Sequence, residues 1–236
     1  MRSSAAPATV VICCGVPAGT SPAAVAPWTN LAARSRMPIT WVCGRDVLPT
    51  VLAGVADEQD VALDLDAAHV ACRPALRREI AAARERVGDI ASIVVSGTPC
   101  LDHRSLLVEQ GIQTVAVGGF EHATRSSRRP PPAGWQCRSI VWGLWEVRTV
   151  PRPPRRAMAW MLAGFAGPRL APGSLTVVHI DPVVIGERQA RGELERLIAW
   201  VGRRPVGVRA ARLGDLPGLL HAGGQPGTGS VLRRAA

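Results

Sequence analysis

The chain has 236 residues, of which 47% are hydrophobic, and this is enough apolar material to bury one large core. The formal net charge is +10, and every basic residue is an arginine. These arginines are scattered through amphipathic stretches or lie in the proline-rich segments 125–132 and 148–156, without interleaved aromatic side chains that could stack on bases. We therefore expect one domain and no nucleic-acid partner.

The six cysteines indicate a reducing compartment. Several lie inside apolar runs of a chain too large to need disulfides for stability, so free and mostly buried thiols are expected. The apolar run near the start is too short for a secretory signal, and no run approaches the roughly 20 residues that span a membrane. We expect a cytoplasmic protein without a membrane partner. The cysteines are Cys13, Cys14, Cys43, Cys72, Cys100 and Cys137.

Short apolar runs alternate with helical patterns along the chain. The runs are rich in β-branched residues, which is typical of strands covered on both faces. The predicted strands are 9–14, 39–43, 60–65, 91–96, 112–117, 138–143, 145–150 and 175–180. The predicted helices are 22–34, 45–53, 74–87, 105–110, 157–164 and 187–201.

This alternation predicts an α/β fold built from βαβ units with a parallel sheet. Eight strands without a glycine-rich dinucleotide motif after the first favour a parallel (β/α) barrel over a doubly wound sheet. We expect a single barrel-like domain over 10–220, flexible ends at 1–9 and 221–236, and an irregular surface loop over 118–136.

Functional side chains of such barrels lie where the strands end. Cys13 and Cys14 end the first predicted strand, and His179 and Asp181 end the last. Asp64, Asp66 and His69 follow the third, and Asp102 and His103 lie beyond the fourth. We expect the residues of the first, third and last strands to surround one mouth of the barrel.

Taken in order, these strand ends resemble the polysaccharide deacetylase (NodB-homology) family over about 10–220. The segment "VICCGVP" at 11–17 is similar to the family's "TFDDGP"-like motif, whose first Asp is a base and whose second binds metal. The segment at 37–47 resembles the second strand, 60–69 resembles the segment that supplies two metal histidines, and 175–183 resembles the last strand with its acid histidine. The resemblance implies a distorted (β/α) barrel and a metal-dependent amide hydrolase site.

The motifs of this chain are degenerate. Cys13 stands where the base belongs and Cys14 where the metal-binding Asp belongs. The first motif histidine falls on Asp64 or Leu65, depending on register, and Gly97 replaces an arginine. The resemblance therefore implies a deacetylase-like protein of carbohydrate metabolism that lacks deacetylase activity and binds a carbohydrate or other small ligand in its mouth.

The alternative is an active amide hydrolase with a remodelled site. Cysteine is a zinc ligand, so Cys14, Asp64 and His69 would offer three ligands and leave one position open, as catalytic zinc sites do. In this hypothesis Cys13 and His179 take the catalytic positions, and Asp66 and Asp181 bind the ligand. The cofactor is accordingly either none or a divalent metal, with zinc the best candidate.

Each of these residues also has a purely structural interpretation. Cys13 and Cys14 can be small buried hydrophobic residues, and an apolar strand end raises the pKa of a thiol. His69 can cap the helix that follows it. Asp64 and Asp66 alternate with leucines, so both point to one side of a strand, as a ligand pair or as an ordinary polar strand end.

Overall fold

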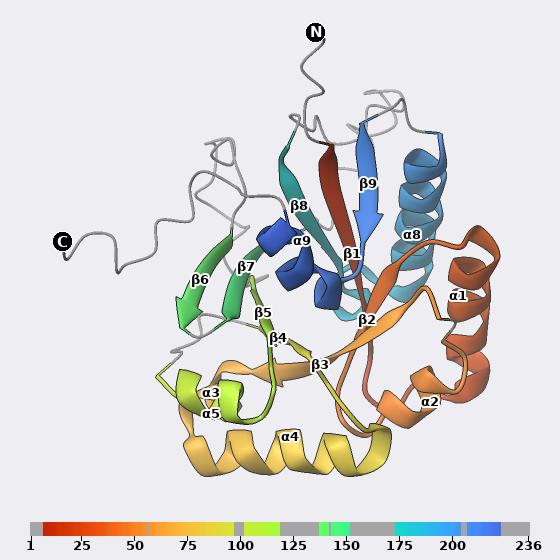
Figure 1. Cartoon of the computed structure of the whole chain (residues 1–236). Coiled ribbons are helices and arrows are strands. Elements are labelled where there is room, and N and C mark those ends of the chain that lie inside the picture. The colour runs from red at the N-terminus through yellow and green to blue at the C-terminus, as the bar shows by residue number, and fades with distance from the viewer. Residues whose placement is uncertain are drawn as a thin grey trace, which may run out of the picture.

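The computed structural model describes residues 7–55, 57–96, 102–118, 137–141, 143–151, 173–203 and 207–222. Within these ranges seven parallel strands form a closed barrel, because β1 pairs with both β2 and β8. The predicted fold class is confirmed (Figure 1). In ring order the strands are β1 (Ala8–Val16), β2 (Ile39–Cys43), β3 (Asp60–Asp66), β4 (Ser92–Ser96), β5 (Thr114–Val117), β7 (Leu144–Pro151) and β8 (Leu175–Ile180).

Two further strands distort the ring. Strand β9 (Val208–Ala211) runs parallel to the beginning of β1, while β2 pairs with the end of β1. Strand β6 (Cys137–Val141) is antiparallel to β7. The prediction that this segment joins the parallel series is therefore wrong. A short connection through Gly143, at φ +85°, leaves no room for the crossover that a parallel pair needs.

Helices cover the outside of the barrel (Figure 1). Leu76, Ile80 and Ala83 of α4 are buried, and the predicted helix at 45–53 is shorter in the structure. The predicted helix at 157–164 and the loop at 119–136 lie outside the described residues. The helices are α1 (Pro22–Ser35), α2 (Leu48–Leu52), α3 (Ala67–Ala71), α4 (Arg73–Val87), α5 (Arg104–Glu109), α7 (Pro182–Ile185), α8 (Glu187–Gly202) and α9 (Leu216–Ala222), with a 3₁₀ helix η2 (Leu213–Asp215).

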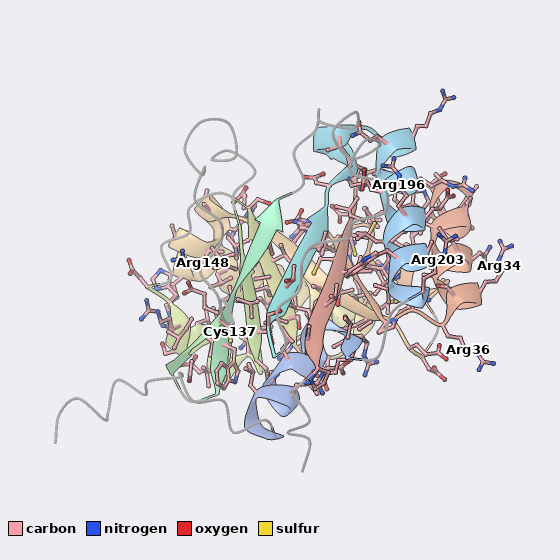
Figure 2. All side chains as sticks on the ribbon, turned by 90° about the horizontal axis from the view of Figure 1, so that it is seen from above. Arg34, Arg36, Cys137, Arg148, Arg196 and Arg203 are labelled. Atoms are coloured by element: carbon pink, nitrogen blue, oxygen red, sulfur yellow. The ribbon has the colours of Figure 1, made fainter. Side chains whose placement is uncertain are left out.

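Arginines of the first helix and its end lie on the outside of this helical layer. Arg34 of α1 and Arg36, which ends that helix in a left-handed conformation, point away from the barrel in Figure 2. None of the described helices is both long and apolar enough to cross a membrane.

Two hydrophobic layers follow from the alternation of side chains along each strand. Val10, Ile12 and Cys14 of β1 belong to an outer cluster shared with the helices. Val11 and Cys13 belong to an inner cluster that fills the barrel. Whether a strand residue faces the barrel interior or the helices therefore depends on its parity in the sequence.

The N-terminal end of the barrel is plugged by η2 and α9. Leu213, Leu216 and Leu220 enter the inner cluster. The Leu213 backbone N–H donates to Thr40 Oγ1 at 2.8 Å, which ties the plug to the start of β2. The polar residues Asp64, Asp66 and His179 lie toward the opposite end, where the strands finish, and this end is called the mouth here.

Candidate functional site

Strand β1 separates the two adjacent cysteines into different layers. Both side chains are 0% exposed, but Cys13 packs in the inner cluster and Cys14 in the outer one. The strand continues to Val16, beyond the predicted end at residue 14, so both cysteines obey strand alternation. Only Cys13 lies on the side of the barrel interior.

Burial controls the chemistry of both thiols. It raises the pKa of the Cys13 thiol far above its ordinary value, and Asp60 adds to this shift. Burial likewise raises the pKa of the Cys14 thiol, with smaller contributions from Cys13 and Asp181. Because the thiolate is the form that binds metal or accepts a proton, neither cysteine is prepared for such a role at neutral pH.

His179 is the neighbour of Cys13 on the adjacent strand. The two residues pair in register between β1 and β8, and His179 is only 3% exposed. Burial lowers the pKa of the imidazole to about 4, although the nearby Asp181 carboxylate opposes the shift. The ring is therefore neutral at physiological pH.

Asp64 is the carboxylate of β3 that faces the mouth. Its neighbours Leu63 and Leu65 belong to the outer cluster, which places Asp64 on the inner side. Asp64 as a whole residue is exposed, but the barrel wall partly buries its carboxyl, and this burial is the main cause that raises its pKa to about 6. Asp181 and Asp66 raise the pKa further, and a hydrogen bond with Ser96 opposes them.

Asp66 and His69 form a local helix cap. Asp66 Oδ1 accepts a hydrogen bond from the His69 backbone N–H at 2.7 Å, at the start of α3. The His69 ring lies against the same oxygen, with Nδ1 2.7 Å away, and its Nε2 is 4.0 Å from Glu79. The capping residue of α3 is therefore Asp66, and His69 lies inside the helix rather than capping it.

The Asp181 carboxylate, which directly follows β8, interacts electrostatically with groups at the mouth. Its Oδ1 accepts a hydrogen bond from the Val183 backbone N–H at 2.8 Å and caps α7. Its charge acts on both Asp64 and His179, so the carboxyl end of β8 and that of β3 converge. The mouth thus contains several carboxylates, a neutral histidine and the Ser96 hydroxyl.

The hypothetical metal set is not assembled. No group of three His, Cys, Asp or Glu side chains that could hold an ion occurs among the described residues. Cys14 lies in the outer layer, whereas Asp64 faces the mouth and His69 is engaged at the start of α3. The residues present therefore do not fit the divalent metal that the resemblance implies. Gly97 lies outside the described residues.

Comparisons with known proteins bear on the fold. No protein-family model and no curated protein matches the chain. A protein of Mycobacterium smegmatis assigned as a polysaccharide deacetylase superposes with a TM-score of 0.59 at 11% identity, covering 96% of this chain and 94% of the other. This chain has the polysaccharide deacetylase fold.

Two further solved structures agree. A protein of Bordetella bronchiseptica, assigned as a polysaccharide deacetylase involved in O-antigen biosynthesis, has a TM-score of 0.51 at 11% identity and covers 90% of both chains. A CE4 esterase of Streptococcus mutans has a TM-score of 0.50 at 13% identity, covering 86% of this chain and 85% of the other. At such identities the likeness concerns the deacetylase fold alone, and it confirms the resemblance seen in the sequence at that level.

Sequence reasoning missed two features of the mouth. It gave Asp64 a metal-binding role but did not foresee that burial and the Asp181 and Asp66 carboxylates raise the pKa of Asp64. It also overlooked Ser96, although this residue ends a predicted strand and stands beside Asp66 in register. The position of Ser96 was a usable signal, but the approach of Asp181 to Asp64 depends on the closed ring and has no local signal.

Proposed function

We propose that this chain is a deacetylase-fold protein that binds a carbohydrate or a related small polar ligand at the barrel mouth without deacetylating it. One observation carries the proposal, namely that the two thiols at the position of the resembled carboxylate pair, Cys13 and Cys14, are both 0% exposed. Burial raises the pKa of each thiol, so neither replaces a carboxylate as a proton acceptor or metal ligand at neutral pH.

The chemistry of amide hydrolysis supports this proposal. The resembled reaction needs a metal that polarises the carbonyl and activates water, together with a group that accepts a proton. Asp64, with a pKa of about 6, retains the capacity to accept a proton near neutral pH. What the mouth lacks among the described residues is a ligand set for the metal.

The remaining polar groups suit binding. Ionised Asp64 and Asp181 accept hydrogen bonds from sugar hydroxyls, and Ser96 can donate one. The buried hydrophobic residues of the inner cluster pack beneath these polar groups. Five described cysteines are free thiols, which supports a reducing cytoplasmic setting for this binding function.

The test is release of acetate from N-acetylated oligosaccharides by the purified protein, with divalent metals added in turn. We expect release no faster than that of the Cys13→Ala variant, because Cys13 supplies no base. The double variant Cys13→Asp, Cys14→Asp should also remain inactive, since Asp64 or Leu65 still stands where the resembled site has a histidine. Metal-dependent turnover that Cys14→Ala abolishes would overturn the proposal and favour the remodelled hydrolase.

Ligand binding is measured separately by isothermal titration with the same oligosaccharides. We expect binding that Asp64→Ala weakens, because this substitution removes an acceptor from the mouth. The matched control is Asp46→Ala, whose exposed carboxylate already forms an ion pair with Arg86. Equal binding by the two variants would contradict a ligand site at the mouth.

A further inference from the structure

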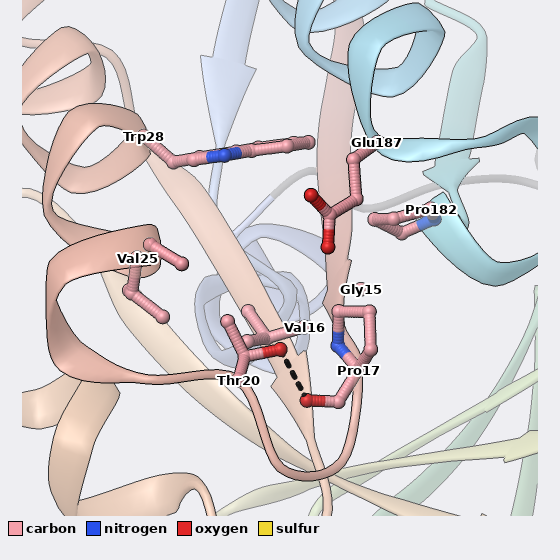
Figure 3. A pocket seen from close by; sticks show the side chains of 9 residues that line it. Gly15, Val16, Pro17, Thr20, Val25, Trp28, Pro182 and Glu187 are labelled. Carbon is pink, nitrogen blue, oxygen red and sulfur yellow. Dashed lines mark hydrogen bonds between the residues drawn. The ribbon is translucent and has the colours of Figure 1, made fainter.

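A pocket lies beside the end of β1, between α1 and the start of α8 (Figure 3). The space between its walls is about 320 Å³ and includes open solvent, so the pocket is shallow. Its walls include Val16, Val25 and two proline rings, Pro17 and Pro182. Val16 and Val25 belong to the helical side of the barrel wall, so this pocket is separate from the mouth that contains Asp64.

An indole and a carboxylate line the pocket from different helices. Figure 3 shows the Trp28 ring extending from α1 and the Glu187 carboxylate turned into the pocket from the first residue of α8. Trp28 packs partly against the outer core, which holds the ring in place. Glu187 forms no ion pair with any residue in the described part of the chain.

The loop after β1 adds a second acceptor. Thr20 Oγ1 donates its only proton to the Pro17 carbonyl oxygen at 2.6 Å, so toward the pocket the hydroxyl oxygen can only accept. Gly15 allows a close approach between β1 and Pro182, because a Cβ atom there would lie 3.2 Å from Pro182 Cδ. The pocket is therefore a shaped feature of β1, α1 and α8.

We propose that this pocket binds a small alkylated ammonium ion of the choline type. The face of an indole attracts a cation more strongly than the other aromatic rings do, and the Glu187 carboxylate supplies the opposite charge. The apolar proline and valine walls suit the methyl groups of such a cation. This site extends beyond the proposed function and does not depend on it.

The choice of an alkylated ammonium over a primary one follows from the apolar walls. The two Glu187 oxygens and Thr20 Oγ1 can accept the three N–H donors of a primary ammonium, but such an ion leaves the valine and proline side chains without an apolar partner. The methyl groups of a quaternary ammonium contact these walls instead. The overall charge of +10 repels cations at long range, so the attraction must come from Trp28 and Glu187 themselves.

The test follows the indole N–H resonance of Trp28 in ¹H–¹⁵N spectra, assigned by its loss in Trp28→Phe. Choline should shift this resonance saturably, and the neutral isostere 3,3-dimethylbutan-1-ol should bind about fivefold more weakly. Glu187→Gln should lower the affinity for choline about fivefold and leave binding of the alcohol unchanged. Glu195→Gln, on the same helix but paired with Arg191, is the matched control and should bind choline normally.

Each other outcome overturns the proposal. Equal affinities for choline and its neutral isostere would show that the pocket is only apolar. Unchanged choline binding in Glu187→Gln would remove the carboxylate from the site, and a resonance that choline does not shift saturably would remove the site altogether. Glu187 is exposed on the first turn of α8, so its substitution leaves the core intact.

Discussion

Two aspartates of strand β3 show how the surroundings of a carboxylate differ between the two ends of the barrel. Asp60 begins β3 at the plugged end, where it accepts hydrogen bonds from the backbone N–H groups of Val61 at 2.8 Å and Gly214 at 3.1 Å. Asp64 lies further along β3 at the mouth, where its charged neighbours are Asp181 and Asp66. Burial raises the pKa of both carboxyls, but Asp60 is also stabilised by the two N–H groups and by Arg212.

Polar groups therefore serve stability at the plugged end of the barrel and function at the mouth. At the plugged end the polar groups form bonds that fasten the plug, as in the pair between Arg212 Nη2 and Asp215 Oδ1 at 2.8 Å. At the mouth, the Asp181 and Asp66 carboxylates instead repel that of Asp64. Groups that are costly for folding but gathered at one place are typical of binding sites. The following predictions test this contrast from the largest effect to the smallest.

Leu213→Ala should lower the free energy of unfolding by about 3 kcal/mol, because it removes a fully buried side chain from the plug and leaves a cavity. Chemical denaturation measures the loss. The matched control is Leu219→Ala, which truncates a partly buried residue of the neighbouring helix and should cost clearly less. Equal losses would mean that the plug does not anchor the inner core.

Asp60→Ala should lower the free energy of unfolding by about 2 kcal/mol, since it leaves the Val61 and Gly214 N–H groups without their acceptor. Asp64→Ala should be neutral or slightly stabilising, because it relieves repulsion at the mouth. Denaturation curves of the two variants at pH 7 measure this difference directly. If Asp64→Ala proved the more destabilising change, the contrast between the two ends would be reversed.

Asp64→Asn should change how stability depends on pH. The pKa of Asp64 is raised in the fold to about 6 from an unfolded value of 3.8, so the native state binds the extra proton and Asp64 lowers stability as pH rises from about 4 to 6. The variant should therefore gain about 1 kcal/mol relative to the parent above pH 6, after allowance for solvent screening. Denaturation midpoints across this range provide the measurement.

Titration of His179 changes stability with pH in the opposite direction over the same pH interval. Its pKa falls to about 4 in the fold from 6.5, so the unfolded state binds more protons and stability rises with pH from about 4 to 6.5. Removing the Asp64 contribution should therefore leave a steeper rise with pH than the parent shows. A flatter profile for Asp64→Asn would mean that the Asp64 pKa is not raised.

The rate of alkylation should distinguish the exposed thiol from the buried ones, and this prediction involves no change in the stability of the protein. Cys72 is exposed, whereas Cys13 and Cys14 are fully buried with raised pKa values. We expect iodoacetamide to modify Cys72 readily and the buried pair only as fast as the chain unfolds. Mass spectrometry of the modified peptides measures the rates. Rapid modification of Cys13 in the native protein would show an accessible, reactive thiol at the mouth.

The barrel could be predicted because its signals are local. Continuous β-branched runs and the spacing of helical patterns depend only on neighbouring residues, and the structure contains the predicted strands with modest shifts at their ends. The antiparallel pairing of β6 is decided by the short turn at Gly143, and the predicted parallel series ignored that turn.

The site was harder to predict because it depends on parity and on distant contacts. Strand β1 continues through Gly15 and Val16, so Cys14 still follows strand alternation and faces the helices. No local pattern marks where β1 ends. The raised pKa of Asp64 depends on Asp181, which approaches only when β8 and β3 belong to one ring. The pocket of Trp28 and Glu187 likewise joins two helices far apart in the chain.

The central claim is that strand alternation separates Cys14 from Asp64 and His69, so that these residues cannot bind one metal ion. The most direct test is the zinc content of protein purified without chelator, measured by mass spectrometry together with the variants Cys14→Ala and Asp64→Ala. We predict that neither substitution changes the zinc content. One zinc ion per chain that both variants lose would contradict the claim.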